Sequence, residues 1–562
     1  MNGFLDALGR WCARRHWIVI FAWLLVLAAL LALRAAFGGQ FSNDYRVPGS
    51  QSSAGKAVLQ KEFPSQSGNA GQIVFHAHTG QVSAAGDAVN TSMTNVAKLP
   101  HVVSTVSPFA SGSPSPLVSK DGTIAYGTVS WDVVPASLDS AYLHRLDDAT
   151  APARSAGLQV EYGGGAGQIG QQTNDKASEI IGLSCALVLL LAMFGSVVAA
   201  ALPLISALFS VFAGVSLVGL LAATMTFPTT APTVATLLGL GVAVDYGLFM
   251  LARHREQLDH GVPVVKSAGR ATGTSGAAIV VAGGTVVVAI LGLYVADVPF
   301  VGALGLASAI VVAITVLAAL TLMPAFMGVA GRNVRALRTL RAERRATAGQ
   351  DEAQAAASAA ELAAAADAAH ERSGFARWGR RVSDRPTGWA LGATAVLVIL
   401  SIPLFSLRLG QLDASTNPTS ESIRRAYDLI AQGFGPGTNG PLTVVVSFPP
   451  GNSTQQNQNL LGQLTSTLQK TPDVAGVGAP TVNQANTTAV VNVVPASSPQ
   501  ASATTHLVNQ LRDSVLPTVP ARTYVVGTTA SYVDFTAKIS QRIVWLIVVV
   551  VSLAFLLLMT AF

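Results

Sequence analysis

The stretch TVATLLGLGVAVDYGLFMLARHREQL, residues 233–258, decides the fold. Between Thr233 and Leu251 only Asp245 is charged, and at about 1.5 Å per residue the run is long enough to span a bilayer core. Asp245 lies eight residues before Arg253, which places it roughly 12 Å inside the charged end of the helix. The stretch therefore predicts a transmembrane helix that carries a carboxylate at membrane depth.

The rest of the chain has a membrane-protein composition. Half of its 562 residues are apolar, 11% are charged and the mean hydropathy is +0.47, whereas soluble proteins carry about 25% charged residues. The two cysteines, Cys12 and Cys185, lie beside or inside apolar runs. No disulfide framework is therefore expected in the long polar segments.

Eight apolar spans predict eight transmembrane helices. They cover about 17–37, 178–194, 198–222, 231–252, 273–295, 299–329, 388–407 and 542–562. The first span is too long for a signal-peptide core and is interpreted as a retained anchor. The predicted divisions are 1–37 (N-terminus and first helix), 38–177 (first outer domain), 178–329 (helices two to six), 330–387 (linker), 388–407 (seventh helix), 408–541 (second outer domain) and 542–562 (eighth helix).

Lysine and arginine residues set the predicted orientation. They gather in the N-terminus, in 253–271 and in 330–387, and the positive-inside rule assigns these segments to the cytoplasm. The segments 38–177 and 408–541 then lie outside the plasma (inner) membrane. The net charge of +6 is thus a topology signal, and no nucleic-acid partner is expected. Residues 350–369 predict an Ala-rich helical linker.

Each outer segment predicts the order strand, helix, strand, strand, helix, strand. In the first, QIVFHAH (72–78) alternates like a strand and 83–98 is helical; in the second, LTVVVSF (442–448) and 454–470 correspond to them. This is the order of a split βαβ unit with ferredoxin-like topology. The fold class is a polytopic α-helical membrane protein with two extracytoplasmic α+β (ferredoxin-like) domains.

The two outer segments belong to an internal repeat. RWCARRHWIVI at Arg10 is echoed by RWGRRVSDRPTGW at Arg377, and VPGSQSSAG at Val47 by NPTSESIRR at Asn417. The offset runs from about 362 to 371 residues. One unit of a helix, an outer domain and five helices is thus followed by a second unit that stops after its second helix. Parallel repeats predict that the two outer domains pack side by side about a pseudo-twofold axis, with an apolar cleft between them.

This arrangement resembles the resistance-nodulation-division (RND) superfamily, and GLGVAVDYGLFMLARHREQ, residues 239–257, is similar to the fourth helix of its actinobacterial MMPL branch. The resemblance implies a proton-driven exporter of lipids or other hydrophobic molecules, with the outer domains as porter domains and no cofactor beyond the proton gradient. It implies that Asp245 and Tyr246 form the proton relay. Phe249 matches an aromatic residue that closes the central cavity, and Gly241 and Ser275 are assigned to the same cavity.

The residues themselves support a special role for Asp245. A carboxylate at mid-bilayer costs on the order of 2.5 to 3.5 kcal/mol and is expected to face the bundle interior on a proton or ion path. The alternative is a static hydrogen bond to a neighbouring helix. Tyr246 points about 100° away from Asp245 on a helix, so its partner is expected on another helix, and a packing tyrosine is the alternative.

Other motifs are weaker. GAGQIG at 165–170 fits G-x-G-x-x-G but precedes a membrane helix, so a flexible joint is preferred over a dinucleotide site. His76 and His78 share one face of a strand, and a solvated strand face is preferred over a metal site. No Walker A, HExxH or Ser-His-Asp pattern is found, so no enzyme is expected. The alternative functions are a sterol- or lipid-sensing or signalling membrane protein and an accessory subunit of protein secretion.

The resemblance departs from its family at the C-terminal end. Family members have twelve helices against eight here, and the repeat offset puts a counterpart of Asp245 near position 607. We therefore expect the 562-residue chain alone to be transport-incompetent. The expected partners are a lipid or hydrophobic substrate, the membrane, and either a completing C-terminal half or further copies of the chain.

Overall fold

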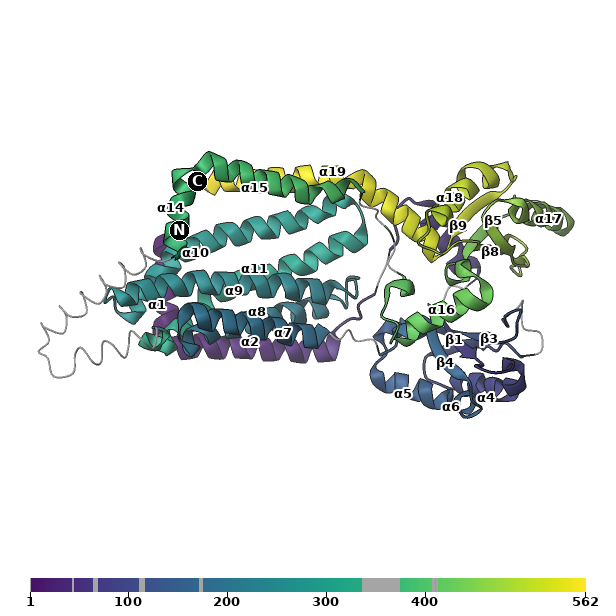
Figure 1. Cartoon of the computed structure of the whole chain (residues 1–562), viewed down its shortest axis with the longest axis horizontal. Helices are drawn as coiled ribbons and strands as arrows, with labels where there is room; N and C mark the ends of the chain where they lie inside the picture. The colour runs from purple at the N-terminus through teal and green to yellow at the C-terminus, as the bar shows by residue number, and fades with distance from the viewer. Residues whose placement is uncertain are drawn as a thin grey trace, which may run out of the picture.

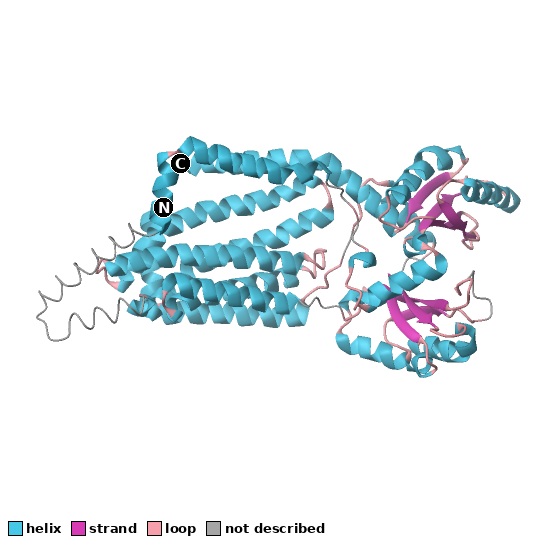
Figure 2. Ribbon diagram, viewed as in Figure 1, coloured by secondary structure: helices cyan, strands magenta, loops and turns pink. Residues whose placement is uncertain are grey.

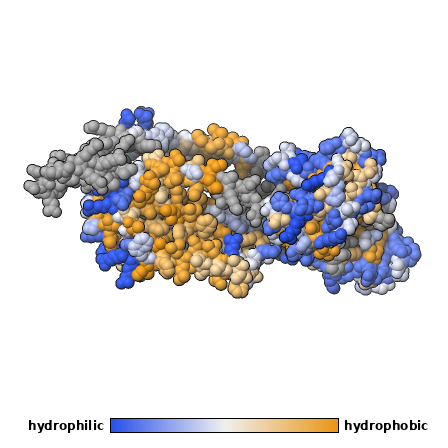
Figure 3. Space-filling model, turned by 90° about the horizontal axis from the view of Figure 1, so that it is seen from below, coloured by the Kyte–Doolittle hydropathy of each residue, from blue (hydrophilic) through white to orange (hydrophobic). Residues whose placement is uncertain are grey.

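Two α+β domains stand at one end of a long helical bundle in the computed structural model (Figures 1 and 2). The structure describes residues 2–42, 45–63, 69–110, 117–170, 175–335, 374–406, 410 and 413–561. The Ala-rich linker predicted over 350–369 lies outside the described residues. Figure 3 shows a largely hydrophobic surface over the bundle and a largely hydrophilic one over the domains.

The bundle is built from long apolar helices. Its described helices are α1 (Asn2–Arg14), α2 (His16–Phe37), α7 (Asp175–Phe194), α8 (Val197–Leu221), α9 (Ala231–Asp259), α10 (Val264–Leu291), α11 (Pro299–Ala330), α14 (Gly374–Asp384), α15 (Pro386–Ser401) and α19 (Thr528–Ala561). Seven helices within the described residues are long and apolar enough to cross a membrane. The apolar part of α7, Ile180–Phe194, is shorter, so the span predicted over 178–194 does not reach that length.

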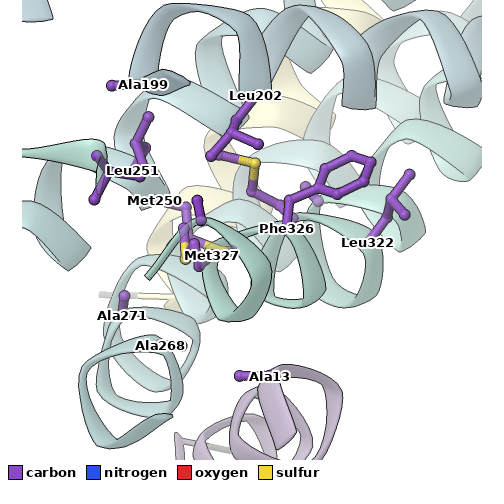
Figure 4. Packing of buried hydrophobic residues seen from close by; sticks show 14 of the residues in the cluster. Ala13, Ala199, Leu202, Met250, Leu251, Ala268, Ala271, Leu322, Phe326 and Met327 are labelled. Atoms are coloured by element: carbon purple, nitrogen blue, oxygen red, sulfur yellow. The ribbon is translucent and has the colours of Figure 1, made fainter. Parts of the chain in front are cut away.

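The core of the bundle lies among α8, α9, α10 and α11, and α1 packs across one end of it. Figure 4 shows Met250 and Leu251 of α9 beside Phe326 and Met327 of α11, with Ala13 of α1 nearby. Small residues bring α1 close to its neighbours. A Cβ atom at Gly9 would overlap Thr272 of α10, and one at Gly328 of α11 would overlap the backbone of Ala13.

Domain 1, residues 69–164, is an antiparallel sheet covered by helices. Its elements are β1 (Asn69–His76), α4 (Gly86–Val96), β2 (Val102–Val106), β3 (Ile124–Trp131), α5 (Ser140–Ala149), α6 (Ala151–Ser155) and β4 (Gln159–Gly164). The strand order is β2-β3-β1-β4, which is that of a split βαβ unit. Trp131 is fully buried and donates its indole N–H to the Tyr142 hydroxyl at 3.1 Å.

Domain 2, residues 442–526, repeats this architecture. Its elements are β5 (Leu442–Ser447), α17 (Thr454–Lys470), β6 (Val474–Val477), β7 (Thr481–Val482), β8 (Thr488–Pro495), α18 (Ser502–Gln510) and β9 (Arg522–Val526). The order is β6-β8-β5-β9, and the short β7 pairs with β8. A capping box between Ser453 and Gln456 fixes the start of α17.

The two domains exchange helices. Helix α3 (Gln51–Glu62) precedes domain 1 in the chain but packs on β9 and β5 of domain 2. Helix α16 (Ser422–Phe434) precedes domain 2 but packs on β4, β1 and β3 of domain 1, where Figure 1 shows it beside the sheet. Each sheet thus has one face covered by its own helices and the other covered by a helix from the opposite repeat.

Helix α19 joins domain 2 to the bundle without a break. It starts at Thr528, two residues after β9, and runs for 34 residues to Ala561 (Figure 1). Asp534 on α19 accepts hydrogen bonds from Arg512 at 2.6 and 3.1 Å and from the Ser52 amide at 3.2 Å. Further along α19, Lys538 forms an ion pair of 2.8 Å with Asp297, in the turn between α10 and α11.

Candidate functional site

Helix α9 has one face of small residues that packs into the bundle. Ala235, Gly239, Ala243 and Gly247 recur every four residues and are all buried. A Cβ atom at Gly239 would lie 2.5 Å from Val311 of α11, and one at Gly247 would lie 3.0 Å from Pro203 of α8. Such small residues let helices approach closely in a membrane, so this face fixes the rotation of α9.

The opposite face of α9 carries three of the predicted site residues. Gly241, Asp245 and Phe249 are spaced four residues apart and are all exposed at the surface of the described bundle. A Cβ atom at Gly241 would meet nothing within 4 Å. Among the residues that the structure describes, the Asp245 carboxylate has neither a hydrogen bond nor an ion pair. The structure thus brings these three residues to one open face, and the expectation that Asp245 faces the bundle interior is not met among the described helices.

Tyr246 points toward α10 instead. Its side chain is half-buried, and a Cβ atom at Gly283 of α10 would lie 3.5 Å from both its hydroxyl oxygen and its ring. The Cβ atom would instead overlap Val316 of α11, so Gly283 leaves space for that valine and Tyr246 lies at van der Waals distance beside it. As expected for the residue after Asp245 on a helix, Tyr246 faces another helix; its role in a relay stays a prediction.

Ser275 lies apart from the open face. It sits on α10 and is only 4% exposed, next to Gly276, which packs against Leu320 of α11. The neighbouring Thr274 is exposed and donates its hydroxyl to the Arg270 carbonyl at 2.9 Å. The assignment of Ser275 to a cavity shared with Phe249 therefore stays a prediction.

Two weaker motifs have structural roles in domain 1. GAGQIG forms a packed turn in which Ala166 is fully buried and a Cβ atom at Gly167 would lie 2.7 Å from Ile423 of α16. The turn through Gly170 is thus packed against α16, whereas residues 171–174, which join it to α7, lie outside the described residues, so the flexible joint stays a prediction. The rings of His76 and His78 lie 4.8 Å apart, and no group of three metal ligands occurs among the described residues.

A pocket of about 690 Å³ lies at the end of the bundle away from the domains, and the sequence did not predict it. It is lined by α1, α9, α10 and the loop between α9 and α10, through Asn2, Gly3, Asp6, Arg10, Arg253, Glu256, Gln257, His260, Val262, Arg270, Gly273 and Thr274. Arg253 and Gln257 continue the four-residue spacing of Asp245 and Phe249 along α9. The pocket depends on the packing of α1 against Gly269 and Gly273, which only the tertiary structure reveals.

A buried carboxylate fixes the exchanged helix α16. Glu161 of β4 accepts two hydrogen bonds from Arg425 of α16, at 2.7 and 3.0 Å, and one from Ser422 at 2.6 Å. Burial alone would raise the pKa of Glu161, but the hydrogen bonds from Arg425, Gln159 and Ser422 outweigh it and hold the pKa below its usual range. The Ser422 hydroxyl also accepts the Tyr162 amide at 2.8 Å.

Long apolar helices, seven of them able to cross a membrane within the described residues, and two interlocked domains at one end of the bundle are the features of a multi-pass membrane protein. The model of the MMPL family matches residues 44–389. The chain belongs to the MMPL family, whose RND-type architecture the sequence resembles.

Three relatives illustrate this membership. Membrane protein YdfJ of Bacillus subtilis is 31% identical over 566 residues, which cover 100% of this chain and 74% of YdfJ. The mycolic acid-containing lipids exporter MmpL11 of Mycolicibacterium smegmatis is 30% identical over 68% of this chain and 39% of its own length. The trehalose monomycolate exporter MmpL3 of Mycobacterium tuberculosis is 29% identical over 54% of this chain and 32% of its own length. The chain thus spans about three quarters of YdfJ but well under half of the two exporters.

Proposed function

We propose that this chain is part of a transporter that exports a lipid or another hydrophobic molecule across the plasma membrane and that the proton-motive force drives the export. The observation that carries the proposal is Asp245, a carboxylate within the apolar part of the 29-residue helix α9. Two relatives are named as exporters of mycolic acid-containing lipids and of trehalose monomycolate, which supports a lipid as cargo. We further propose that the N-terminus faces the cytoplasm and that domains 1 and 2 face outward.

The proposed proton carrier is the Asp245 carboxylate. A charged side chain within the hydrocarbon core of a bilayer is costly, so the Asp245 side chain is tolerated there more readily when a proton neutralises it. Tyr246, which contacts α10 at Gly283, is the proposed second member of the relay. Phe249, one turn from Asp245 on the open face, is the proposed barrier between that carboxylate and the pocket at the end of the bundle.

The test compares two aspartate variants of the same helix. Asp245→Asn keeps the shape of the side chain but cannot titrate, so we expect it to abolish proton-coupled export. Asp259→Asn is the matched control, because Asp259 ends α9 and pairs with Arg335 at 2.6 Å, outside the apolar stretch. Envelope lipids are compared by mass spectrometry in a strain lacking the gene and in strains complemented with the wild type or either variant.

We expect one lipid species to disappear on deletion, to return with the wild type and Asp259→Asn, and to stay absent with Asp245→Asn at equal membrane abundance. A wild-type lipid profile in the Asp245→Asn strain would show that Asp245 is structural. Vesicles that hold the chain together with the proteins that copurify with it, loaded with a pH-sensitive dye, distinguish transport from lipid sensing, because a sensor needs no proton flux. An unchanged lipid profile on deletion would contradict lipid export.

A further inference from the structure

Helix α1 presents an aromatic and basic stripe outward from the bundle. Phe4 is 73% exposed and Trp11 is 50% exposed, and they lie seven residues apart on the same side of the helix, with Ala7 between them. Arg14 follows Trp11 by three residues and is also exposed. Among the described residues, neither Arg14 nor Arg15 has a carboxylate within ion-pair distance.

The other side of α1 is held firmly by the bundle. Leu5, Gly9, Cys12 and Ala13 are buried against α10 and α11. The backbone of Arg15 is non-helical, with φ −104° and ψ 37°, so α1 ends there and α2 begins at His16 as a separate helix. The outward stripe is therefore fixed in direction.

The stripe is continuous with the surface that faces the bilayer. Trp17 and Phe21 of α2 are each 68% exposed and follow α1 directly in the chain. Aromatic residues with a polar atom prefer the boundary between headgroups and acyl chains, and arginine beside them prefers anionic headgroups. This continuity favours a lipid surface over a second copy of the chain or a soluble partner.

The second repeat carries the same combination on α14. Arg377 and Trp378 repeat Arg10 and Trp11, and Trp378 is 56% exposed with its ring 6.2 Å from that of Trp389. Figure 1 shows α14 and the N-terminus at the same end of the bundle, away from the domains. Two short helices, each directly before an apolar helix, thus have a matching basic and aromatic composition.

We propose that α1 and α14 lie in the membrane surface and bind headgroups of anionic phospholipids in the leaflet at the end of the bundle away from the domains. Phe4 and Trp11 enter the boundary with the acyl chains, while Arg14 and Arg15 contact the phosphates. With Arg377 aligned on Arg10, Arg381 takes the position of Arg14 on α14, and Arg380 precedes it in the chain. Because α1 packs on α10, a lipid bound to α1 would be separated by one helix contact from α10, the helix that Tyr246 faces.

The experiment places a fluorophore on each helix of the full chain. In a Cys12→Ala, Cys185→Ala background, Ala7→Cys or Ser383→Cys is labelled, and the protein is reconstituted into phosphatidylcholine bilayers. Brominated phosphatidylglycerol or brominated phosphatidylcholine is added at the same fraction as quencher. We expect brominated phosphatidylglycerol to quench either label roughly twofold to fivefold more strongly at low salt, because each basic residue near an anionic surface adds favourable binding energy.

Charge variants then test the cause. Arg14→Gln with Arg15→Gln should bring the quenching ratio at position 7 to about one, and Arg380→Gln with Arg381→Gln should do so at position 383. Lys470→Gln with Arg522→Gln removes the same charge from domain 2 and should leave both ratios unchanged. High salt should lower both ratios by screening.

Equal quenching by the two lipids at either label would overturn the proposal. So would a preference that survives the arginine substitutions, or one that disappears on dilution of the protein, since that would identify a second copy as the occupant. The test does not depend on export, so it stands or falls separately from the proposed function.

Discussion

Glu161 and Arg425 show how a single residue pair can hold two domains together. The Glu161 side chain is 6% exposed, and Arg425 reaches it from a helix more than 260 positions along the chain. A buried carboxylate is costly without a cation, so this pair specifies which helix covers the sheet of domain 1. Hydrophobic packing of Ala426 and Ile430 against Val74 supplies the rest of the contact.

We predict that Arg425→Gln loosens α16. The substitution leaves the buried Glu161 carboxylate without its cation, and we expect it to lower the free energy of unfolding by roughly 1–3 kcal/mol. Arg424→Gln is the matched control, because it removes the same charge without leaving a buried carboxylate unpaired: Arg424 pairs with the half-exposed Asp428, worth about 0.5 kcal/mol, and donates to the Ser415 and Asn417 carbonyls. Thermal unfolding in detergent measures both. An equal drop in unfolding temperature in the two variants would mean that loss of a positive charge from α16, and not loss of the Glu161 pair, causes the effect.

The same pair predicts a direction of pH dependence. The pKa of Glu161 is lowered in the folded protein, so its contribution to stability is present above the unfolded-state value of about 4.3 and is lost as the pH falls toward the folded-state value. Domain docking should therefore weaken in acid below about pH 4. Glu161→Gln should flatten this dependence. A wild-type profile that matches the Gln variant throughout would contradict the assignment.

At the scale of elements, local sequence patterns predicted most of the secondary structure. The helix predicted over 454–470 is α17, and the strand predicted over 442–448 is β5. The exchange of α3 and α16 was not predicted, because local periodicity cannot specify which distant sheet a helix covers. For the site, the spacing of Gly241, Asp245 and Phe249 on one helix face was readable from the sequence. The buried position of Ser275 and the pocket beneath α1 depend on how helices pack.

We predict opposite effects of alanine at two helical glycines. A Cβ atom at Gly55 of α3 would overlap Val526 and lie 2.5 Å from the Cβ of Tyr524, so Gly55→Ala should destabilise by roughly 1–3 kcal/mol. Gly462 on α17 has nothing within 4 Å, so Gly462→Ala should stabilise by up to about 1 kcal/mol. Thermal unfolding distinguishes them. Stabilisation by Gly55→Ala would show that α3 does not dock on β9.

A disulfide can trap the exchange directly. A Cβ atom at Gly163 of β4 would lie 3.3 Å from the Cβ of Ala426 on α16, close to the separation that a disulfide requires. Gly163→Cys with Ala426→Cys should therefore crosslink on mild oxidation, seen as a mobility shift on a non-reducing gel. Gly163→Cys with Gln432→Cys, on the exposed side of α16, should not. Equal crosslinking of both pairs would indicate a mobile helix.

At the scale of the whole molecule, the proposed orientation predicts which ends of the protein water-soluble reagents reach. In the Cys-free background, Gln463→Cys on the exposed side of α17 should react with an impermeant thiol reagent in intact cells. His260→Cys, exposed in the loop between α9 and α10 at the end where α1 lies, should react only after lysis. The reverse pattern would invert the topology, since the two sites lie at opposite ends of the molecule (Figure 1).

The unbroken helix α19 has a mechanical consequence. A rod of 34 helical residues is about 51 Å long, so a tilt of only ~5° about one end moves the other end by ~4 Å. Asp534 clamps this rod to Arg512 of domain 2 and to the start of α3, and Lys538 clamps it to the α10–α11 turn. Because the helix is continuous, a sideways movement of its bilayer part must move domain 2 as well. Helix α3 is attached to domain 2, so this movement of domain 2 also displaces the segment that connects α3 to α2.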